Sequence, residues 1–171
     1  LTVLNHQEIP LVDVLANEFL EDAVNGLDVT LHGEGIDLEC HAEESYIKID
    51  YDLMKTVLLN LIDNAKKADS RRILLEGRRE SDGYRITVAD DGKGIPEEEL
   101  SRITEAFYMV DKSRARKQHG AGLWLSLVSR IVELHHGELE ITSTLGEGTR
   151  VNVILPCSDM QEKFLEKGEV V

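Results

Sequence analysis

The sequence predicts a single α/β domain, and three observations support this class. An apolar run at helical spacing extends from Asp50 to Ala68 with no interior glycine or proline, which predicts a long amphipathic helix. Segments 73–90 and 139–155 alternate apolar and polar residues around glycine-containing turns, which predicts two antiparallel hairpins. The 171 residues suffice for one good core but are few for two full domains.

The first part of the chain predicts a helix followed by two strands. Apolar residues recur at helical spacing over 11–23, and Gly26 follows as a stop signal. Alternation at 29–31 and 36–40, on either side of the glycine-containing segment 32–35, predicts two short strands joined by a turn.

The remaining elements follow in order along the chain. Asp50 or Asp52 is expected to cap the long helix, and the first hairpin is expected to end at Asp90. A short helix is predicted to begin at 96–99, and a mobile basic loop at 109–120. A helix over 123–134 is expected to end before Gly137, and the polar segment after Pro156 is expected to be peripheral.

Composition restricts the classes of partner and the compartment. The formal net charge is −14, from 33 acidic and 19 basic residues, which argues against binding to a phosphate backbone. No apolar run approaches the roughly 20 residues that a membrane span needs, and the first residues lack a signal layout. The two cysteines show no metal-ligand spacing. We therefore expect a cytoplasmic domain without nucleic-acid or membrane contact.

The long helix concentrates polar side chains on one sector. With Asn60 as zero and about 100° per residue, Asn64 points to roughly 40° and Lys67 to roughly 340°. The apolar side chains gather between roughly 100° and 160°: Met54, Leu58, Leu61 and Ala65. Two amides and an ammonium in one sector suit a hydrated Mg²⁺ ion and the phosphates that it bridges. The alternative is a solvated helix face.

Three glycine-rich blocks follow the long helix: DDGKGIP at 90–96, HGAGLWL at 119–125 and GEGT at 146–149. In the first, Gly92 and Gly94 allow the backbone to turn sharply and approach a flat ligand. The second precedes a helix, so its N–H groups can point at a phosphate. Taken singly, the first and third blocks are also typical of ordinary turns.

Together with NLIDNAKKA at 60–68, these blocks resemble, in order and spacing, the catalytic domain of sensor histidine kinases. That domain is part of the wider superfamily of gyrase, Hsp90-type chaperones and mismatch-repair ATPases. The resemblance implies the Bergerat fold, a two-layer α/β sandwich with a mixed sheet of about five strands and about three helices on one face. It also implies an ATP-binding catalytic domain at 11–156, preceded by the end of a dimerisation helix and linker at 1–10 and followed by a tail at 157–171.

The resemblance also implies roles for individual residues, with ATP and Mg²⁺ as ligands. Asn64 is the implied magnesium ligand, Lys67 the implied phosphate contact, and Asn60 supports both. Asp90 accepts a hydrogen bond from the adenine amino group, whereas Asp91 has no such role. The base is lined by Gly92, Gly94 and Ile95, and Thr149 can form a hydrogen bond beside Asp90 near adenine. The lid and phosphate contacts are assigned to Lys112, Arg114, Gly120, Gly122 and Leu123.

Some positions depart from the family pattern. Trp124 stands where the third glycine of the second glycine block is expected, and Thr104 and Met109 replace the usual Phe and Arg. The indole can obstruct the phosphate path, or turn away and pack. The related hydrolytic ATPases place at position 60 a glutamate that activates water, and here the residue is Asn60.

The implied reaction is transfer of the γ-phosphoryl group of ATP to a histidine on a dimerisation domain, with a response regulator downstream. None of the six histidines has the sequence context of that acceptor, so we expect an excised catalytic domain. Two alternatives stay open: a nucleotide-binding regulatory module without kinase activity, if Trp124 prevents lid closure, and a hydrolytic ATPase, which the residue at position 60 disfavours.

Overall fold

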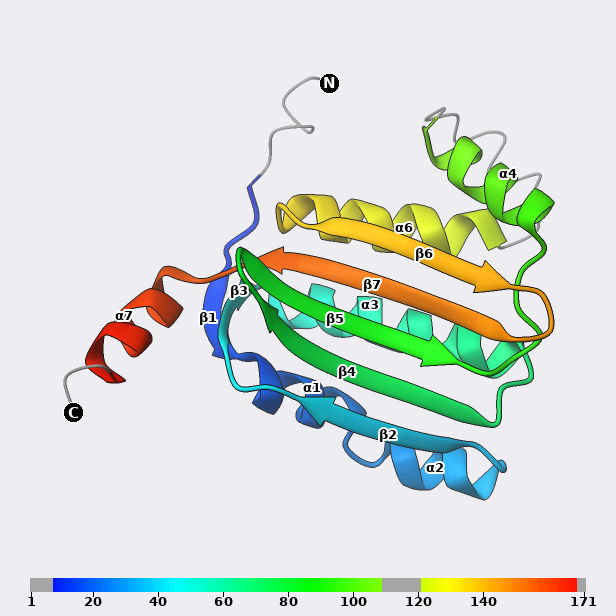
Figure 1. Cartoon of the computed structure of the whole chain (residues 1–171), viewed down its shortest axis with the longest axis horizontal. Helices are drawn as coiled ribbons and strands as arrows, with labels where there is room; N and C mark the ends of the chain where they lie inside the picture. The colour runs from blue at the N-terminus through cyan, green and yellow to red at the C-terminus, as the bar shows by residue number, and fades with distance from the viewer. Residues whose placement is uncertain (1–7, 109–120, 169–171) are drawn as a thin grey trace.

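A computed structural model of the chain describes residues 8–108 and 121–168 (Figure 1). The side chains of 104–108, 121–123 and 164 fall outside this description. The elements are β1 (Val12–Leu15), α1 (Ala16–Val24), α2 (Leu27–Gly33), β2 (Asp37–Ala42), β3 (Tyr46–Ile49), α3 (Tyr51–Lys67), β4 (Arg72–Glu80), β5 (Gly83–Asp90), α4 (Glu97–Tyr108), α6 (Ala121–Leu134), β6 (Glu138–Thr144), β7 (Gly148–Pro156) and α7 (Asp159–Gly168).

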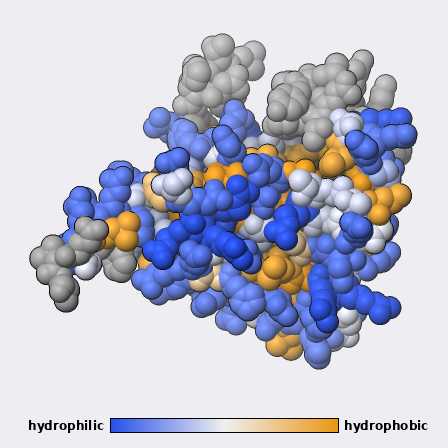
Figure 2. Space-filling model, viewed as in Figure 1, coloured by the Kyte–Doolittle hydropathy of each residue, from blue (hydrophilic) through white to orange (hydrophobic). Residues whose placement is uncertain are grey.

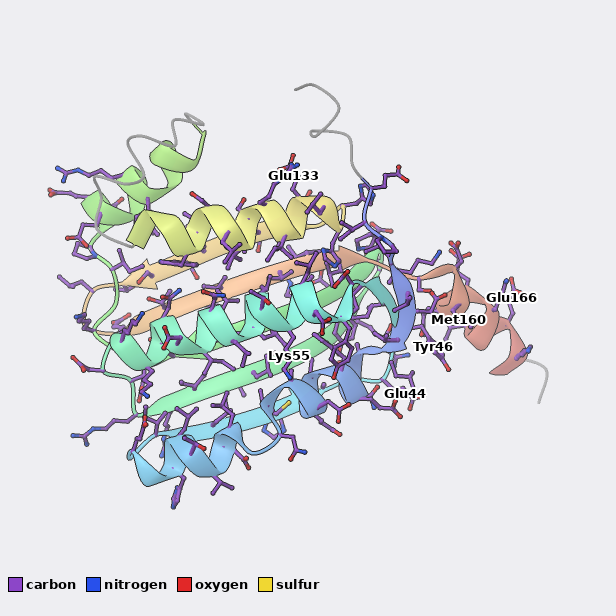
Figure 3. All side chains as sticks on the ribbon, turned by 180° about the vertical axis from the view of Figure 1, so that it is seen from behind. Glu44, Tyr46, Lys55, Glu133, Met160 and Glu166 are labelled. Carbon is purple, nitrogen blue, oxygen red and sulfur yellow. The ribbon has the colours of Figure 1, made fainter. Side chains whose placement is uncertain are left out.

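The elements form two layers. Five strands pair in the order β2-β4-β5-β7-β6; the β2–β4 pair is parallel and the others are antiparallel. Helices α1, α3 and α6 lie on one face of this mixed sheet, as the views from both sides show (Figures 1 and 3). The predicted two-layer α/β sandwich, with five strands and three covering helices, is confirmed.

The predicted long helix is confirmed as α3. Asp50 caps it, because its carboxylate accepts a hydrogen bond from the Leu53 N–H at 3.0 Å. One face is buried against the sheet: Met54, Val57, Leu58, Leu61, Ile62 and Ala65. Burial of each large apolar side chain contributes about 1.5–3 kcal/mol, so packing rather than propensity fixes the rotation of α3 and leaves Asn60 and Asn64 away from the buried stripe.

A buried histidine ties α6 to the start of α3. His135 is 1% exposed, and its Nε2 accepts a hydrogen bond from the Asp50 N–H at 3.0 Å. Its Nδ1 therefore carries the proton and donates to the Ile131 carbonyl at 2.7 Å. Both ring nitrogens are satisfied, which accounts for a histidine in the core as a structural link.

The prediction that the first helix begins near position 11 is wrong. Residues Val12–Leu15 form strand β1, and the helix begins only at Ala16. β1 pairs with β3, a strand that the sequence analysis did not predict. The apolar residues near position 14 fit either periodicity, and the decisive factor is non-local: Ile47 and Ile49 of β3 are fully buried, and β3 offers an open edge to β1.

The strand predicted at 29–31 is also wrong, because these residues belong to helix α2. Gly26, with φ of 83°, ends α1 and redirects the chain. Val29 is 72% exposed whereas Leu31 is 2% exposed, so the two residues do not share the buried face that their alternation indicated. The second predicted strand and both hairpins are confirmed as β2, β4–β5 and β6–β7.

The helix predicted to begin at 96–99 is confirmed as α4, which ends at Tyr108, and the segment after Pro156 contains helix α7. The side chain of Gln161 accepts a hydrogen bond from the Tyr46 N–H at 2.7 Å, which attaches α7 to β3. The loop predicted at 109–120 lies outside the described residues. Across the part of the chain that the structure describes, no helix has both the length and the apolarity to cross a membrane.

Candidate functional site

Two glycine-rich segments interlock at the end of the sheet where β5 and β6 finish: the β5–α4 loop (91–96) and the β6–β7 turn (145–147) (Figure 1). The Gly146 N–H donates to the Lys93 carbonyl at 2.7 Å. A Cβ on Gly94, with φ of 72°, would lie 2.2 Å from the Thr144 carbonyl oxygen. A Cβ on Gly148, with φ of 126°, would lie 1.9 Å from that of Asp90. Only glycine permits this approach.

The β5–α4 loop is also attached to the end of α3. The Lys93 N–H donates to the Ala68 carbonyl at 2.8 Å. The carboxylate of Asp91 accepts hydrogen bonds from the Arg71 and Arg72 N–H groups at 2.8 and 2.9 Å. Asp91 therefore has a structural task, which agrees with its exclusion from the predicted base contacts. The loop is held from both sides.

Asp90 is the titratable group at the centre of this arrangement. It is half-buried at the end of β5, and its carboxylate accepts a hydrogen bond from the Gly92 N–H at 2.9 Å. Burial raises the pKa of Asp90, while hydrogen bonds from Gly92, the Ser70 hydroxyl and the Thr149 N–H oppose that rise. The Ser70 oxygen also lies 2.6 Å from the Ala65 carbonyl. Its single proton serves one acceptor at a time, so Asp90 keeps capacity to accept from a ligand.

The amides of α3 lie half-buried one turn apart. Asn60 donates through Nδ2 to the Thr56 carbonyl at 2.8 Å. The Nδ2 of Asn64 is buried and has no hydrogen-bond partner among the described residues. A buried polar group without a hydrogen-bond partner lowers stability by about 1–3 kcal/mol. A ligand with a hydrogen-bond acceptor near Asn64 would remove this cost. Lys67 is 73% exposed and forms an ion pair with Asp63 at 2.9 Å.

The same contacts bring Asn64 and Asp90 to one end of the molecule. Asn64 lies one turn before Ala68, whose N–H donates to the Asn64 carbonyl at 3.0 Å. Ala68 in turn contacts the loop that follows Asp90. Thr149 faces Asp90 in the β5–β7 register. The structure therefore gathers six of the predicted residues at this end, with Asn60 one turn before Asn64 on α3: Asn64, Asp90, Gly92, Gly94, Ile95 and Thr149.

The chemistry of the donors fits Mg²⁺ held jointly with a nucleotide. Magnesium accepts amide oxygens and keeps several waters, and Asn64 carries such an oxygen next to its orphaned Nδ2. Over residues 8–108 and 121–168, no group of three or more His, Cys, Asp or Glu side chains could hold a metal ion. A metal at Asn64 would thus depend on phosphate oxygens and water for its remaining ligands.

The predicted lid residues are only partly placed. Lys112, Arg114 and Gly120 lie outside the described residues, as does Met109. Gly122 and Leu123 belong to the first turn of α6, as backbone only. Trp124 follows them and is half-buried, with its indole packed against the hydrophobic core. This position corresponds to the alternative in which the indole turns away and packs.

The sequence analysis missed two hydroxyl groups of this site, those of Ser70 and Ser143. Ser70 is 4% exposed and lies between the end of α3 and Asp90. The Ser143 hydroxyl accepts a hydrogen bond from the Ile95 N–H at 2.8 Å. Their only signal in the sequence is proximity to a recognisable block, since the contacts arise from the interlocked loops.

Comparison with known proteins places the chain in one family. The family described as histidine kinase-, DNA gyrase B-, and HSP90-like ATPase matches residues 49–159, from the end of β3 to the start of α7. The chain is a member of this ATPase family, and ATP is the nucleotide that membership implies.

Individual proteins are similar to the chain in sequence or in fold. The sensor protein kinase WalK of Staphylococcus saprophyticus is 33% identical over 150 residues, which cover 85% of this chain and 25% of WalK. The ATP-binding domain of PrrB from Mycobacterium tuberculosis has a TM-score of 0.69 at 22% identity and covers 88% of this chain and 100% of that domain. Full-length ShkA in complex with AMPPNP has a TM-score of 0.72 at 27% identity, over 89% of this chain and 32% of ShkA. The chain thus spans about a quarter of WalK.

Proposed function

We propose that this chain binds Mg-ATP beside α3 and presents the γ-phosphoryl group to a histidine on a separate dimerisation domain, as a histidine kinase catalytic domain. The observation that carries the proposal is the pairing of two incompletely satisfied groups at one end of the sheet. Asp90 is a half-buried carboxyl whose pKa is raised by burial, and Asn64 holds a buried, unpaired amide nitrogen. Both are supported by the interlocked glycine segments.

The base-binding part of the mechanism follows from this geometry. Asp90 accepts a hydrogen bond from the exocyclic amino group of adenine, and its fixed hydrogen bond from Gly92 sets its orientation. Gly92 and Gly94 leave the loop without side chains, so that the flat base can lie close to the backbone. Ile95 and Thr149 line the base.

The phosphate-binding part is carried by α3 and the lid. Asn64 would hold Mg²⁺, with Asn60 and Lys67 beside it on the same sector of the helix. When bound, the ion would neutralise charge on the phosphate oxygens. Lys112 and Arg114 supply lid cations, and the N–H groups around Gly120, Gly122 and Leu123 are suited to face phosphate at a helix start.

The residue at position 60 favours phosphoryl transfer over hydrolysis. A carboxamide cannot take a proton from water, and the Asn60 Nδ2 is engaged with the Thr56 carbonyl. A neutral histidine nitrogen needs no such base, so positioning and charge neutralisation are sufficient for transfer to histidine.

The partners of this proposal are a dimerisation domain with the acceptor histidine and a response regulator that receives the phosphoryl group. Relatives such as WalK, a sensor protein kinase that is much longer than this chain, support a multidomain setting. ATP supply and a response-regulator partner favour the cytoplasm.

Autophosphorylation after rejoining the chain to an upstream dimerisation domain tests the proposal. Labelled γ-phosphate is expected on histidine in an acid-labile form, and Asn64→Ala in the same protein should abolish most of it. Rapid steady ATP hydrolysis by the chain alone, without an acceptor domain, would show a hydrolytic ATPase instead.

A regulatory module that binds nucleotide without kinase activity is the second candidate, because Trp124 stands where the family has glycine. Calorimetric titration with a non-hydrolysable ATP analogue separates the two. The packing of the indole against the core leads us to expect similar affinities for the native chain and Trp124→Gly. Absent or millimolar binding that recovers in Trp124→Gly would support the regulatory module.

A further inference from the structure

The hydroxyl of Ser143, near the end of β6, joins three separate segments of the candidate site. Its Oγ accepts a hydrogen bond from the Ile95 N–H at 2.8 Å. It also lies 2.8 Å from the Thr149 Oγ1 and 3.1 Å from the Gly148 carbonyl oxygen, and its one proton can go to either of these two acceptors. One half-buried side chain thus connects the β5–α4 loop to the start of β7.

Counting protons shows that Ser143 and Thr149 form a switchable pair. A serine hydroxyl has one proton and two acceptor positions, and Ile95 occupies one acceptor position. If Ser143 donates to Gly148, Thr149 donates to Ser143 and presents only lone pairs to a ligand. If Ser143 donates to Thr149, the Thr149 proton becomes available. The direction of the Thr149 hydroxyl therefore depends on Ser143.

Adenine requires the second arrangement. Its exocyclic amino group is a donor and the neighbouring ring nitrogen is an acceptor, so the site must offer an acceptor next to a donor. Asp90 is the acceptor, and Thr149 faces it across the β5–β7 pair. A Thr149 hydroxyl that receives a proton from Ser143 is free to donate to the ring nitrogen directly or through one water.

On the basis of the proposed function, we infer that Ser143 is a positioning residue for the adenine base. It fixes Ile95 through the backbone and sets Thr149 as a donor beside Asp90. Ser143 does not itself contact the nucleotide. Its effect is exerted on base affinity and leaves the phosphoryl-transfer chemistry at Asn64 unchanged.

Two substitutions at position 143 and one matched control test this inference. Ser143→Ala removes the hydroxyl, Ser143→Thr keeps it, and Thr142→Ala changes the adjacent exposed residue of β6. By calorimetry with a non-hydrolysable ATP analogue, Ser143→Ala should bind about tenfold more weakly. Ser143→Thr should recover most of the affinity, and Thr142→Ala should bind like the native chain.

A kinetic readout separates positioning from a general loss of structure. In the protein rejoined to its dimerisation domain, Ser143→Ala should raise KM for ATP about tenfold while kcat changes less than about twofold. A fall in kcat at constant KM would assign Ser143 a purely structural role and overturn the inference. Equal affinities of Ser143→Ala and the native chain for the analogue would also overturn it.

Failure of the proposed function gives a different result. If the native chain binds the analogue but the rejoined protein transfers no phosphoryl group, the kinase proposal fails while the affinity ratio between native and Ser143→Ala still tests Ser143. If the native chain binds no adenine nucleotide, both are overturned.

Discussion

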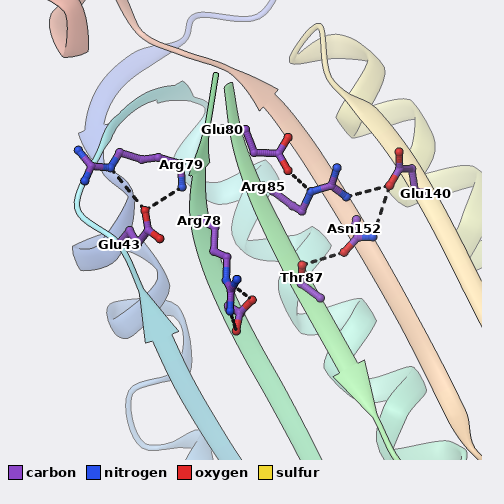
Figure 4. A network of polar contacts seen from close by, with 9 residues as sticks. Glu43, Arg78, Arg79, Glu80, Arg85, Thr87, Glu140 and Asn152 are labelled. Carbon is purple, nitrogen blue, oxygen red and sulfur yellow. Dashed lines mark hydrogen bonds and ion pairs between the residues drawn. The ribbon is translucent and has the colours of Figure 1, made fainter. Parts of the chain in front are cut away.

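Strand β5 carries two polar sites that differ in how well their charges are satisfied. In its middle, on the open face of the sheet, the Arg85 guanidinium bonds to Glu80 and, at 2.8 Å, to Glu140 (Figure 4). The Asn152 amide donates to Glu140 at 3.4 Å and accepts from the Thr87 hydroxyl at 2.7 Å. Polar side chains cover much of this face (Figure 2).

The charges of this open-face network (Glu80, Arg85, Thr87, Glu140 and Asn152) stabilise one another. The two carboxylates raise the pKa of Arg85, and Arg85 lowers the pKa of Glu140. At the end of the same strand the environment disfavours the charged form of a carboxyl group, because burial raises the pKa of Asp90. Asn64 nearby lacks a partner for its buried nitrogen. The fold supplies partners for the charges of the open-face network, whereas Asp90 and Asn64 are left with groups that a ligand can pair with.

Gly148→Ala should break the support of the site most strongly. The Cβ of the alanine would lie 1.9 Å from the Asp90 carbonyl oxygen, and the alanine would also have to adopt a φ of 126°. We therefore expect a loss of about 3 kcal/mol or more in unfolding free energy. Gly146→Ala is the matched control, since its φ is 83° with no atom within 4 Å of the added Cβ, and should cost only about 1–2 kcal/mol. Chemical denaturation measures both, and equal losses would contradict the interlocked arrangement.

Asp90→Asn should separate binding from stability. Replacing the acceptor by an amide that faces the adenine amino group should weaken ATP-analogue affinity by about 1–3 kcal/mol, as measured by calorimetry. Because the folded pKa of Asp90 is raised, the ionised carboxylate lowers stability above its unfolded pKa. The variant should therefore melt no lower than the native chain at neutral pH.

Any gain in melting temperature from Asp90→Asn should vanish below about pH 4, because the native Asp90 carboxyl is then protonated in both the folded and the unfolded state. Unchanged analogue affinity in the folded variant would remove Asp90 from the site.

Asn64→Ala should further separate the effect of the site on ligand binding from its effect on stability. The substitution removes a buried, unpaired amide nitrogen and introduces a better helix former, so the melting temperature should not fall. The gain in analogue affinity produced by Mg²⁺ should drop on the order of tenfold. Titrations with Mg²⁺ and with EDTA give the two affinities, and a magnesium effect that survives intact would exclude Asn64 as a metal ligand.

Arg85→Gln should have the smallest effect. Exposed ion pairs contribute little, so we expect a slight loss of stability at neutral pH and native affinity for the ATP analogue. Since Glu140 has a lowered folded pKa, its contribution is present above the unfolded pKa and is lost as pH falls through the folded value. The difference in melting temperature should disappear in acid; weakened nucleotide binding would instead couple the network to the site.

Local signals explain why much of the fold could be predicted from the sequence. α3 has a capping residue and a long apolar stripe, and both hairpins have alternating strands around a turn. β1 and β3 have four residues each, and what makes them strands is their mutual pairing, which no local window contains. The two-residue alternation around Val29 was too short to distinguish a strand from α2.

The candidate site divides in the same way. The positions of Asn60, Asn64, Asp90 and Thr149 in the fold were predictable because each belongs to a block anchored on a predictable element. Asp90 and Thr149 also meet through regular β5–β7 pairing. Ser70 and Ser143 were not predictable, because their hydrogen bonds depend on how the β5–α4 loop lies against α3 and against the β6–β7 turn.

Trp124 gives the protein a fluorescence signal from a single site. It is the only tryptophan in the chain, and its indole lies half-buried in the first turn of α6, next to the segment assigned to the lid. Emission excited at the red edge of the absorption band therefore arises from one known place. Any rearrangement of the start of α6 would shift the wavelength or intensity of this emission, so Trp124 is a built-in reporter of changes at this end of the helix.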